Sequence, residues 1–433
     1  MTDLPYDILY RIAEEVAAPS TTQRPDGRGR FPFDHPALLP SVLAADLDAA
    51  KNLRSCALTS RSWSAPASTV NIRHLDIWRA SQEAIGAALA RNERYELVHH
   101  FQTGREYCPD CMTHYTERAE DDGPSARPPC ANGVSMRTLL WTLRRCPNMR
   151  RLTVHEWLDL DAPVDYSTYA PFSTITSFRL GLSQDISRRV ALRSFCQLLR
   201  LLPSLRRLSF GDISATDASI DDIPPPDFQL ESLAVSDARG IRFASYEWLL
   251  SNSLQSLHTF WVYGVFDEKS EASYIGGIQL CSQTLRTLYV FGRSRYSFPN
   301  LQSCAQLEEL CIEDTHLLSA DLFDPHASLR RLSIAATSFT GTHRGDRPVL
   351  VFFPPDDLQR LTDILGKPYN AFPKLEVLSI ETSAYGDIVD APIEELRALR
   401  TTCETRGIAF HFPRMVELES DPRADLERWG VPL

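Results

Sequence analysis

The segment Leu285-Arg286-Thr287-Leu288-Tyr289-Val290 carries the pattern that decides the fold of this chain. Its first, fourth and sixth positions are apolar. The same spacing returns at eight other places, which begin at Met149, Ile175, Leu205, Leu230, Leu257, Leu307, Leu329 and Leu375. Alternate residues of a strand point to the same face, so one copy cannot bury its apolar side chains without neighbouring copies. The pattern therefore predicts a stack of short parallel strands.

Most successive copies lie 22 to 30 residues apart, a period similar to that of leucine-rich repeats. In that family each unit supplies one strand and a return helix or loop. Helical stretches at 138–143 and 195–202 precede two of the strands. The asparagine that usually follows the strand is missing almost throughout. We therefore expect an irregular α/β solenoid over 138–412, with a last strand at 408–412 and a polar tail over 413–433.

The last two copies lie 46 residues apart, which breaks the period. The stretch between them contains the apolar run Val349-Leu350-Val351-Phe352-Phe353 and a predicted helix near 356–365. This stretch is either an enlarged connection or one disguised repeat.

The composition is ordinary for a globular protein, with 43% hydrophobic and 23% charged residues among 433. The net charge of −11 argues against nucleic acid as the main partner, because phosphate binding needs a concentrated basic surface. No apolar run approaches the roughly 18 to 20 residues of a membrane span, and the N-terminus lacks the pattern of a signal peptide. We expect a cytoplasmic and/or nuclear protein without membrane partners, whose ten cysteines are mostly buried thiols.

An amphipathic helix is predicted close to the N-terminus, where one apolar stripe contains Leu4, Ile8, Leu9, Ile12 and Val16. A loop rich in Pro, Gly, Ser, Thr and Arg follows at 17–40. A second helical segment then contains Leu53-x-x-Cys56-Ala57-Leu58-Thr59-Ser60-Arg61-Ser62-Trp63. Together the two segments resemble the F-box, a three-helix module, especially in the form common in mushroom-forming fungi. The chain departs from the F-box pattern at Thr59, where Val is usual, and in the inserted loop.

The resemblance implies an F-box domain at 1–70 that docks on the Skp-type adaptor of SCF (Skp–cullin–F-box) ubiquitin ligases, while the repeats hold a protein substrate. The adaptor-facing residues that it implies are Leu4, Pro5, Ile8, Leu9, Ile12, Leu53, Cys56, Leu58 and Trp63. On this interpretation the chain catalyses nothing but raises the local concentration of a substrate. The alternative is a leucine-rich scaffold outside any ligase, whose N-terminal helices only cap the solenoid.

A candidate substrate surface follows from the strand pattern, which places four aromatic side chains on neighbouring strands about 4.8 Å apart. They are Trp261, Tyr263, Tyr289 and Phe291. Clustered aromatics are typical of interface hot spots, but a loop or the C-terminal tail could instead cover this patch. The charged residues expected beside the patch are Arg151, Arg179 and Arg207 on one side, and Glu309 and Glu313 on the other.

The connecting region 71–137 contains Cys108-Pro109-Asp110-Cys111-Met112-Thr113-His114, followed by Cys130. These three cysteines and the histidine could hold a structural zinc ion, although the second CxxC pair of a common zinc motif is absent. No P-loop, dinucleotide-binding fingerprint or Gly-x-Ser-x-Gly elbow is present. We therefore expect no enzymatic activity and no cofactor besides the candidate zinc ion.

Overall fold

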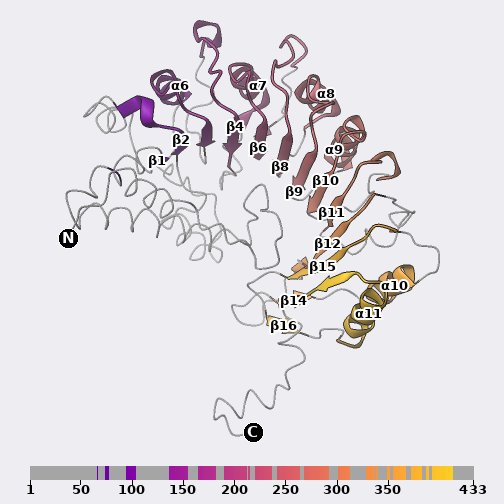
Figure 1. Ribbon diagram of the computed structural model, residues 1–433. Coiled ribbons are helices and arrows are strands. Elements are labelled where there is room, and N and C mark those ends of the chain that lie inside the picture. Colours follow the sequence, from indigo (N-terminus) through magenta and orange to yellow (C-terminus); the bar gives the residue numbers. More distant parts are fainter. Residues whose placement is uncertain are drawn as a thin grey trace, which may run out of the picture. The chain divides into compact units, whose positions relative to one another are not determined.

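The computed structural model of the chain forms two compact units, which are shown in Figure 1. The N-terminal unit contains residues 1–230 and 234–241, and the C-terminal unit contains residues 231–233 and 242–433. The structure describes residues 66, 74–77, 94–103, 136–154, 164–181, 190–211, 213–214, 220–236, 241–263, 268–291, 301–312, 328–336, 338–339, 349–351, 355–366, 372–382, 387–389 and 393–412.

The described strands of the main sheet in the N-terminal unit follow one another in chain order. They are β1 (His74–Ile77), β2 (His100–Thr103), β3 (Arg151–Val154), β4 (Ser177–Leu180) and β6 (Arg207–Gly211), and the next strand, β8 (Ser232–Ser236), has residues in both units. From β1 to β6 each strand pairs in parallel with the next. Two short strands, β5 (Val190–Ala191) and β7 (Ile213–Ser214), form a separate parallel pair.

The C-terminal unit repeats this arrangement. Its main strands are β9 (Thr259–Tyr263), β10 (Thr287–Phe291), β11 (Glu309–Ile312), β12 (Arg331–Ala336), β15 (Val377–Thr382) and β17 (Ala409–His411). They pair in parallel in that order, without exception. Every strand predicted from the repeat pattern is therefore confirmed, including the last strand near 408–412, and the fold is α/β as expected.

Equivalent positions of successive repeats lie opposite one another, which explains why the apolar spacing is so regular. Phe260, Leu288 and Leu310 are in register on β9, β10 and β11, and none is more than 2% exposed. The backbone fixes this register before each strand. The carbonyl of Arg286 accepts hydrogen bonds from the amides of Glu308 and Glu309 at 2.8 and 2.9 Å. The carbonyl of Glu308 does the same for the next repeat.

Helices lie on one side of the strands within each unit (Figure 1). The α-helices are α6 (Met136–Arg145), α7 (Leu192–Arg200), α8 (Phe243–Leu250), α9 (Glu268–Leu280), α10 (Pro355–Gly366) and α11 (Ile393–Thr405). The short 3-10 helices are η1 (Arg94–Leu97), η2 (Tyr166–Thr168) and η4 (Leu301–Ser303). A buried cysteine directly follows three of the described helices: Cys146 follows α6, Cys281 follows α9 and Cys304 follows η4. The carbonyl of Cys304, for example, accepts a hydrogen bond of 2.9 Å from the amide of Leu307.

The long interval between the last two repeats is an enlarged connection. Strand β12 pairs directly with β15, so no strand of the interval enters the main sheet between them. Instead β14 (Val349–Val351) pairs with β13 (Ser338–Phe339) and β16 (Asp387–Val389) in a separate small sheet. The helix expected near 356–365 is confirmed as α10.

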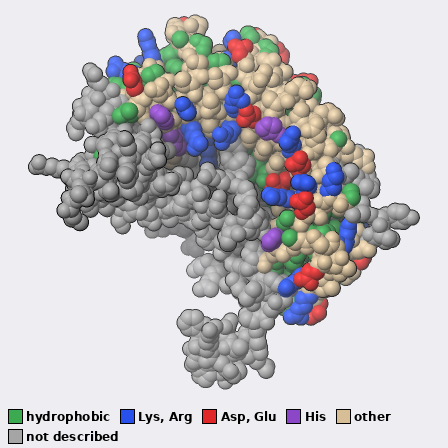
Figure 2. Space-filling view, in the orientation of Figure 1, with side chains coloured by type: hydrophobic (Ala, Val, Ile, Leu, Met, Phe, Trp, Pro, Cys, Tyr) green, Lys and Arg blue, Asp and Glu red, His purple; other side chains and the backbone are tan. Residues whose placement is uncertain are grey.

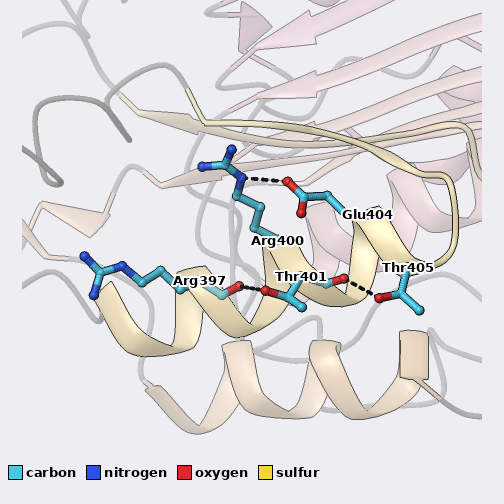
Figure 3. Close-up of polar contacts among 5 residues, drawn as sticks. All are labelled: Arg397, Arg400, Thr401, Glu404 and Thr405. Carbon is cyan, nitrogen blue, oxygen red and sulfur yellow. Dashed lines mark hydrogen bonds and ion pairs between the residues drawn. The ribbon is translucent and has the colours of Figure 1, made fainter.

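Helix α11 shows how the last repeat is closed (Figure 3). On its polar side the hydroxyls of Thr401 and Thr405 donate to the carbonyls four residues earlier, at 2.9 and 2.8 Å, and Arg400 Nε donates to Glu404 Oε1 at 2.9 Å. The helix ends at Thr405, and Gly407 beyond it has a φ of +69°, the left-handed conformation typical of the residue that follows a helix C-terminus. This turn lets the chain enter β17.

Two described strands of the main sheet were not predicted from the repeat pattern. Strands β1 and β2 lie inside the segment 71–137 that the sequence assigned to a connecting region, and both pair within the main sheet of the N-terminal unit. Among the described residues, no helix is long and apolar enough to cross a membrane.

Helices α8 and α9 pack so closely that a glycine substitution in α9 tests the contact between the two helices. A Cβ added at Gly277 would lie 3.0 Å from the Cδ1 atom of Tyr246, which is buried and cannot move away. We expect Gly277→Ala to lower the free energy of unfolding by about 1 kcal/mol, because the overpacking outweighs the better helix propensity of alanine. Urea denaturation followed by circular dichroism measures this.

The matched control is Gly276→Ala in the same helix. Its added Cβ would meet the ring of Phe243 at 2.5 Å, but this residue is 38% exposed, so its ring can rotate outward. Gly276→Ala should therefore be neutral or slightly stabilising. Equal stability of the two variants would contradict the close packing at Tyr246.

Burial raises the pKa of several cysteine thiols well above the usual value of 9.0. The pKa is about 12 for Cys146, Cys196 and Cys281 and about 11 for Cys403, and that of Cys304 is also raised. Unfolded thiols ionise near pH 9 while the folded ones stay protonated. These thiols therefore make their full contribution to the free energy of unfolding below pH 9. This contribution is lost as the pH rises towards 11 or 12. At pH 10 the loss should be about 1.4 kcal/mol for each of Cys146, Cys196, Cys281 and Cys403.

Urea denaturation at pH 8 and pH 10 tests this expectation, and labelling of native thiols at pH 8 provides an independent check. Thiol reagents should modify these cysteines only as fast as the protein opens. Rapid labelling of these five cysteines in the native chain, or equal stability at both pH values, would show that the thiols are accessible.

Candidate protein-interaction surface

The N-terminal unit presents one face of its sheet as two rows of side chains, set by the parallel register. The first row contains His100, Arg151, Ser177 and Arg207, and the second contains Gln102, Thr153, Arg179 and Ser209. The residues that alternate with them, such as Leu152 and Val154, are buried in the core. Arg151 and Arg207 are exposed and Arg179 is partly exposed. We call the three arginines the basic face.

Hydroxyl groups alternate with the arginines across the basic face. Ser177 lies between Arg151 and Arg207 in the first row, and Arg179 lies between Thr153 and Ser209 in the second. The ring nitrogen Nε2 of His100 lies 3.2 Å from the hydroxyl of Thr153. The surface is therefore built from charged and neutral hydrogen-bond donors on rigid strands.

The charge of this surface is one-sided. Strands β3, β4 and β6 contain no acidic residue, and exposed Arg150 and Arg206 directly precede two of them. Figure 2 shows Lys or Arg side chains and His side chains gathered over this part of the unit. Arg150 and Arg206 were not predicted from the sequence as part of this surface, although a signal was present: a doubled arginine follows the first apolar position in both of these repeats.

The C-terminal unit differs, because its equivalent row is covered. Trp261 and Tyr289 lie opposite each other on β9 and β10, with ring centroids 4.2 Å apart. The two strands therefore bring together two of the four predicted aromatics. Each side chain is only 5% exposed, and the Tyr289 hydroxyl donates to Glu309 Oε1 at 3.1 Å. This burial exists within a single chain, so the chain itself covers the pair.

The sequence left two interpretations of the aromatic residues open: exposure to a partner, or coverage by another part of the chain. Trp261 and Tyr289 are covered. The expectation that this pair is exposed as a partner-binding patch is therefore wrong. Tyr263 and Phe291 are also opposite each other in the register of β9 and β10, but their side chains lie outside the described residues, as does Glu313. Arg179 and Arg207 remain on an accessible face.

Charges in the C-terminal unit alternate in sign along the starts of its strands. Arg286, Glu308, Arg330 and Glu376 are all exposed and precede successive strands. Arg330 and Glu376 form an ion pair of 3.3 Å. Because neighbouring charges here compensate one another, this edge lacks the one-sided charge of the basic face, and Figure 2 shows Lys or Arg beside Asp or Glu in this unit.

The remaining predicted sites lie outside the described residues. These are the adaptor-facing residues Leu4, Pro5, Ile8, Leu9, Ile12, Leu53, Cys56, Leu58 and Trp63, and the zinc candidates Cys108, Cys111, His114 and Cys130. Within the part of the chain that the structure describes, no cluster of three or more His, Cys, Asp or Glu side chains could hold a metal ion. Metal analysis of the purified protein would test the zinc prediction.

Comparison with known proteins gives limited similarity. No family model matches the chain, and no curated protein does. Among solved structures, a chain of the TLR13–ssRNA13 complex is similar at 15% identity with a TM-score of 0.33, over 55% of this chain and 30% of that one. A chain of the yeast Rad7–Elc1 complex is similar at 13% identity with a TM-score of 0.23, over 82% of this chain and 94% of that one. The protein thus spans less than a third of the first of these chains.

Proposed function

We propose that this protein is the substrate-recognition subunit of an SCF-type ubiquitin ligase. In this proposal the F-box-like segments bind a Skp-type adaptor on a cullin core, and the repeats bind a protein substrate. The observation that carries it is the pair of motifs, Leu4–Ile12 and Leu53–Trp63, in front of a stack of parallel repeats. An interaction module and a rigid sheet face are the two parts that such a receptor needs.

The protein has no catalytic step of its own in this function. It would hold the substrate beside a ubiquitin-loaded enzyme and so convert a reaction between separate molecules into one within a complex. Strands suit this task better than loops, since their side chains are fixed by register and backbone hydrogen bonds. We expect the complex in the cytoplasm and/or nucleus.

Affinity capture of the full chain with the proteasome inhibited tests the proposal. The Skp-type adaptor and a cullin should be recovered together with at least one ubiquitin-conjugated protein, and the conjugates should decrease when the adaptor is depleted. The second candidate function is a non-ligase scaffold. It would be favoured if a stable partner is captured reproducibly while adaptor and cullin are absent.

A further inference from the structure

Helix α6 presents an outer face that combines arginines with an aromatic ring. Arg137, Trp141, Arg144 and Arg145 follow one another at helical spacing, which places them on the same side of the helix. The three arginines are exposed and Trp141 is partly exposed, whereas Leu140 on the other side is buried. We call the four outward residues the α6 face.

Two aromatic rings hold one arginine of the α6 face in place. The guanidinium carbon of Arg145 lies 4.8 Å from the centroid of the Trp141 ring and 5.5 Å from that of Tyr95 in η1. Arg145 Nη1 also donates to the Tyr95 hydroxyl at 3.5 Å. Asn148 Nδ2 donates to the carbonyl of Glu96 at 2.9 Å, which is a second link between η1 and the end of α6. The face is therefore ordered before a partner arrives, which reduces the entropic cost of binding.

The other two arginines of the α6 face are available to a partner. Within the part of the chain that the structure describes, the side chains of Arg137 and Arg144 form no ion pair, hydrogen bond or ring contact. Helices η1 and α6 together contain four arginines and one acidic residue, Glu96. This local excess of positive charge contrasts with the net charge of −11 of the whole chain. The α6 face is therefore complementary in charge to an acidic partner.

The helix spacing sets how such a partner can be arranged. With a rise of about 1.5 Å per residue, Arg137 lies about 6 Å before Trp141 along the helix axis and Arg144 about 4.5 Å beyond it. Side chains on one face of an extended peptide are about 6.8 Å apart. A central apolar side chain can thus contact the indole ring while carboxylates two residues to either side reach the two arginines. Each guanidinium can bind a carboxylate through two parallel hydrogen bonds.

We propose that the α6 face binds an acidic segment of a partner protein in which Asp or Glu residues flank an apolar residue. Trp, Tyr and Arg are enriched in interface hot spots, and all three meet here on an ordered surface. A single-stranded nucleic acid fits less well, because a phosphate backbone needs a longer track of cations and the acidic remainder of the chain would repel it. The inference does not rest on the ligase proposal, since the face serves a ligase receptor and a scaffold equally.

The test is fluorescence anisotropy with the full chain and a labelled peptide that contains the sequence Glu-Ser-Leu-Ser-Glu. The double variant Arg137→Gln with Arg144→Gln should bind this peptide about tenfold more weakly or worse, because two charge-assisted contacts are lost. The matched control, Arg200→Gln with Arg207→Gln, removes two exposed arginines of the same unit from α7 and β6. It should bind within about twofold of the wild type, since the same charge is removed away from α6.

The apolar contact is tested separately with Trp141→Ala. A second peptide with serine in place of the leucine should bind the wild type about fivefold more weakly, because the contact with the indole ring is lost. In Trp141→Ala the two peptides should bind equally. Leucine and serine peptides that still differ about fivefold in this variant would contradict the assignment of the apolar contact to Trp141.

Three further outcomes would overturn the inference. These are no binding of the leucine peptide to the wild type, equal weakening in both double variants, or tighter binding of a single-stranded RNA oligonucleotide that depends on Arg137 and Arg144. Binding of a Skp-type adaptor by the Arg137→Gln/Arg144→Gln variant should match the wild type, so a failure here is distinct from a failure of the ligase proposal.

Discussion

Replacement of Trp261 by alanine is expected to lower the free energy of unfolding of the C-terminal unit by about 3–5 kcal/mol. The side chain is 5% exposed and its ring lies 4.2 Å from that of Tyr289, so the substitution removes a large buried surface and a ring contact. Tyr289 is in turn held by its hydrogen bond to Glu309, which limits how far the site can collapse around the cavity. Urea denaturation followed by circular dichroism measures the change.

Phe243→Ala is the matched control for this prediction. Phe243 is an aromatic residue of the same unit but is 38% exposed, so its loss should cost less than about 1 kcal/mol. A small effect of Trp261→Ala, together with weaker capture of a partner protein, would show that Trp261 is a surface contact. That result would restore the interpretation that the structure rejects.

The positions of the strands could be predicted from the sequence because the signal is local. Each repeat must present alternate apolar side chains to the same core, so spacing alone identifies the main-sheet strands from β3 to β15. The same spacing is present at Ile72-x-x-Leu75-x-Ile77, where β1 was missed, and at Val98-x-x-Phe101-x-Thr103, where β2 ends on a threonine. These two copies lie before the regular series and are separated from it along the sequence, which is why they were not predicted.

The accessibility of a sheet face could not be predicted in the same way. Trp261, Tyr289 and Arg179 occupy equivalent positions in their repeats, and sequence spacing places all three on the same kind of face. Whether such a position is covered depends on contacts between distant parts of the chain. The aromatic pair is covered, whereas Arg179 is partly exposed. The candidate protein-interaction surface is therefore the basic face and not the aromatic pair.

The second large effect is expected at the N-terminal helix. Ile8→Asp combined with Leu9→Asp should reduce the affinity for a Skp-type adaptor at least a hundredfold, which is about 3 kcal/mol. The two substitutions place carboxylates in the apolar stripe on which the proposed docking depends, and an unpaired charge is strongly disfavoured in an apolar interface. Arg11→Asp is the control, because it introduces one carboxylate on the polar side of the same predicted helix.

Direct binding of a purified Skp-type adaptor to the full chain tests the central claim. The account predicts that the wild type and Arg11→Asp bind the adaptor, whereas the Ile8→Asp/Leu9→Asp variant does not bind, with the melting temperature of the repeat region unchanged. Undiminished binding by the double variant, or no binding by the wild type, would contradict the claim that this protein is an F-box receptor.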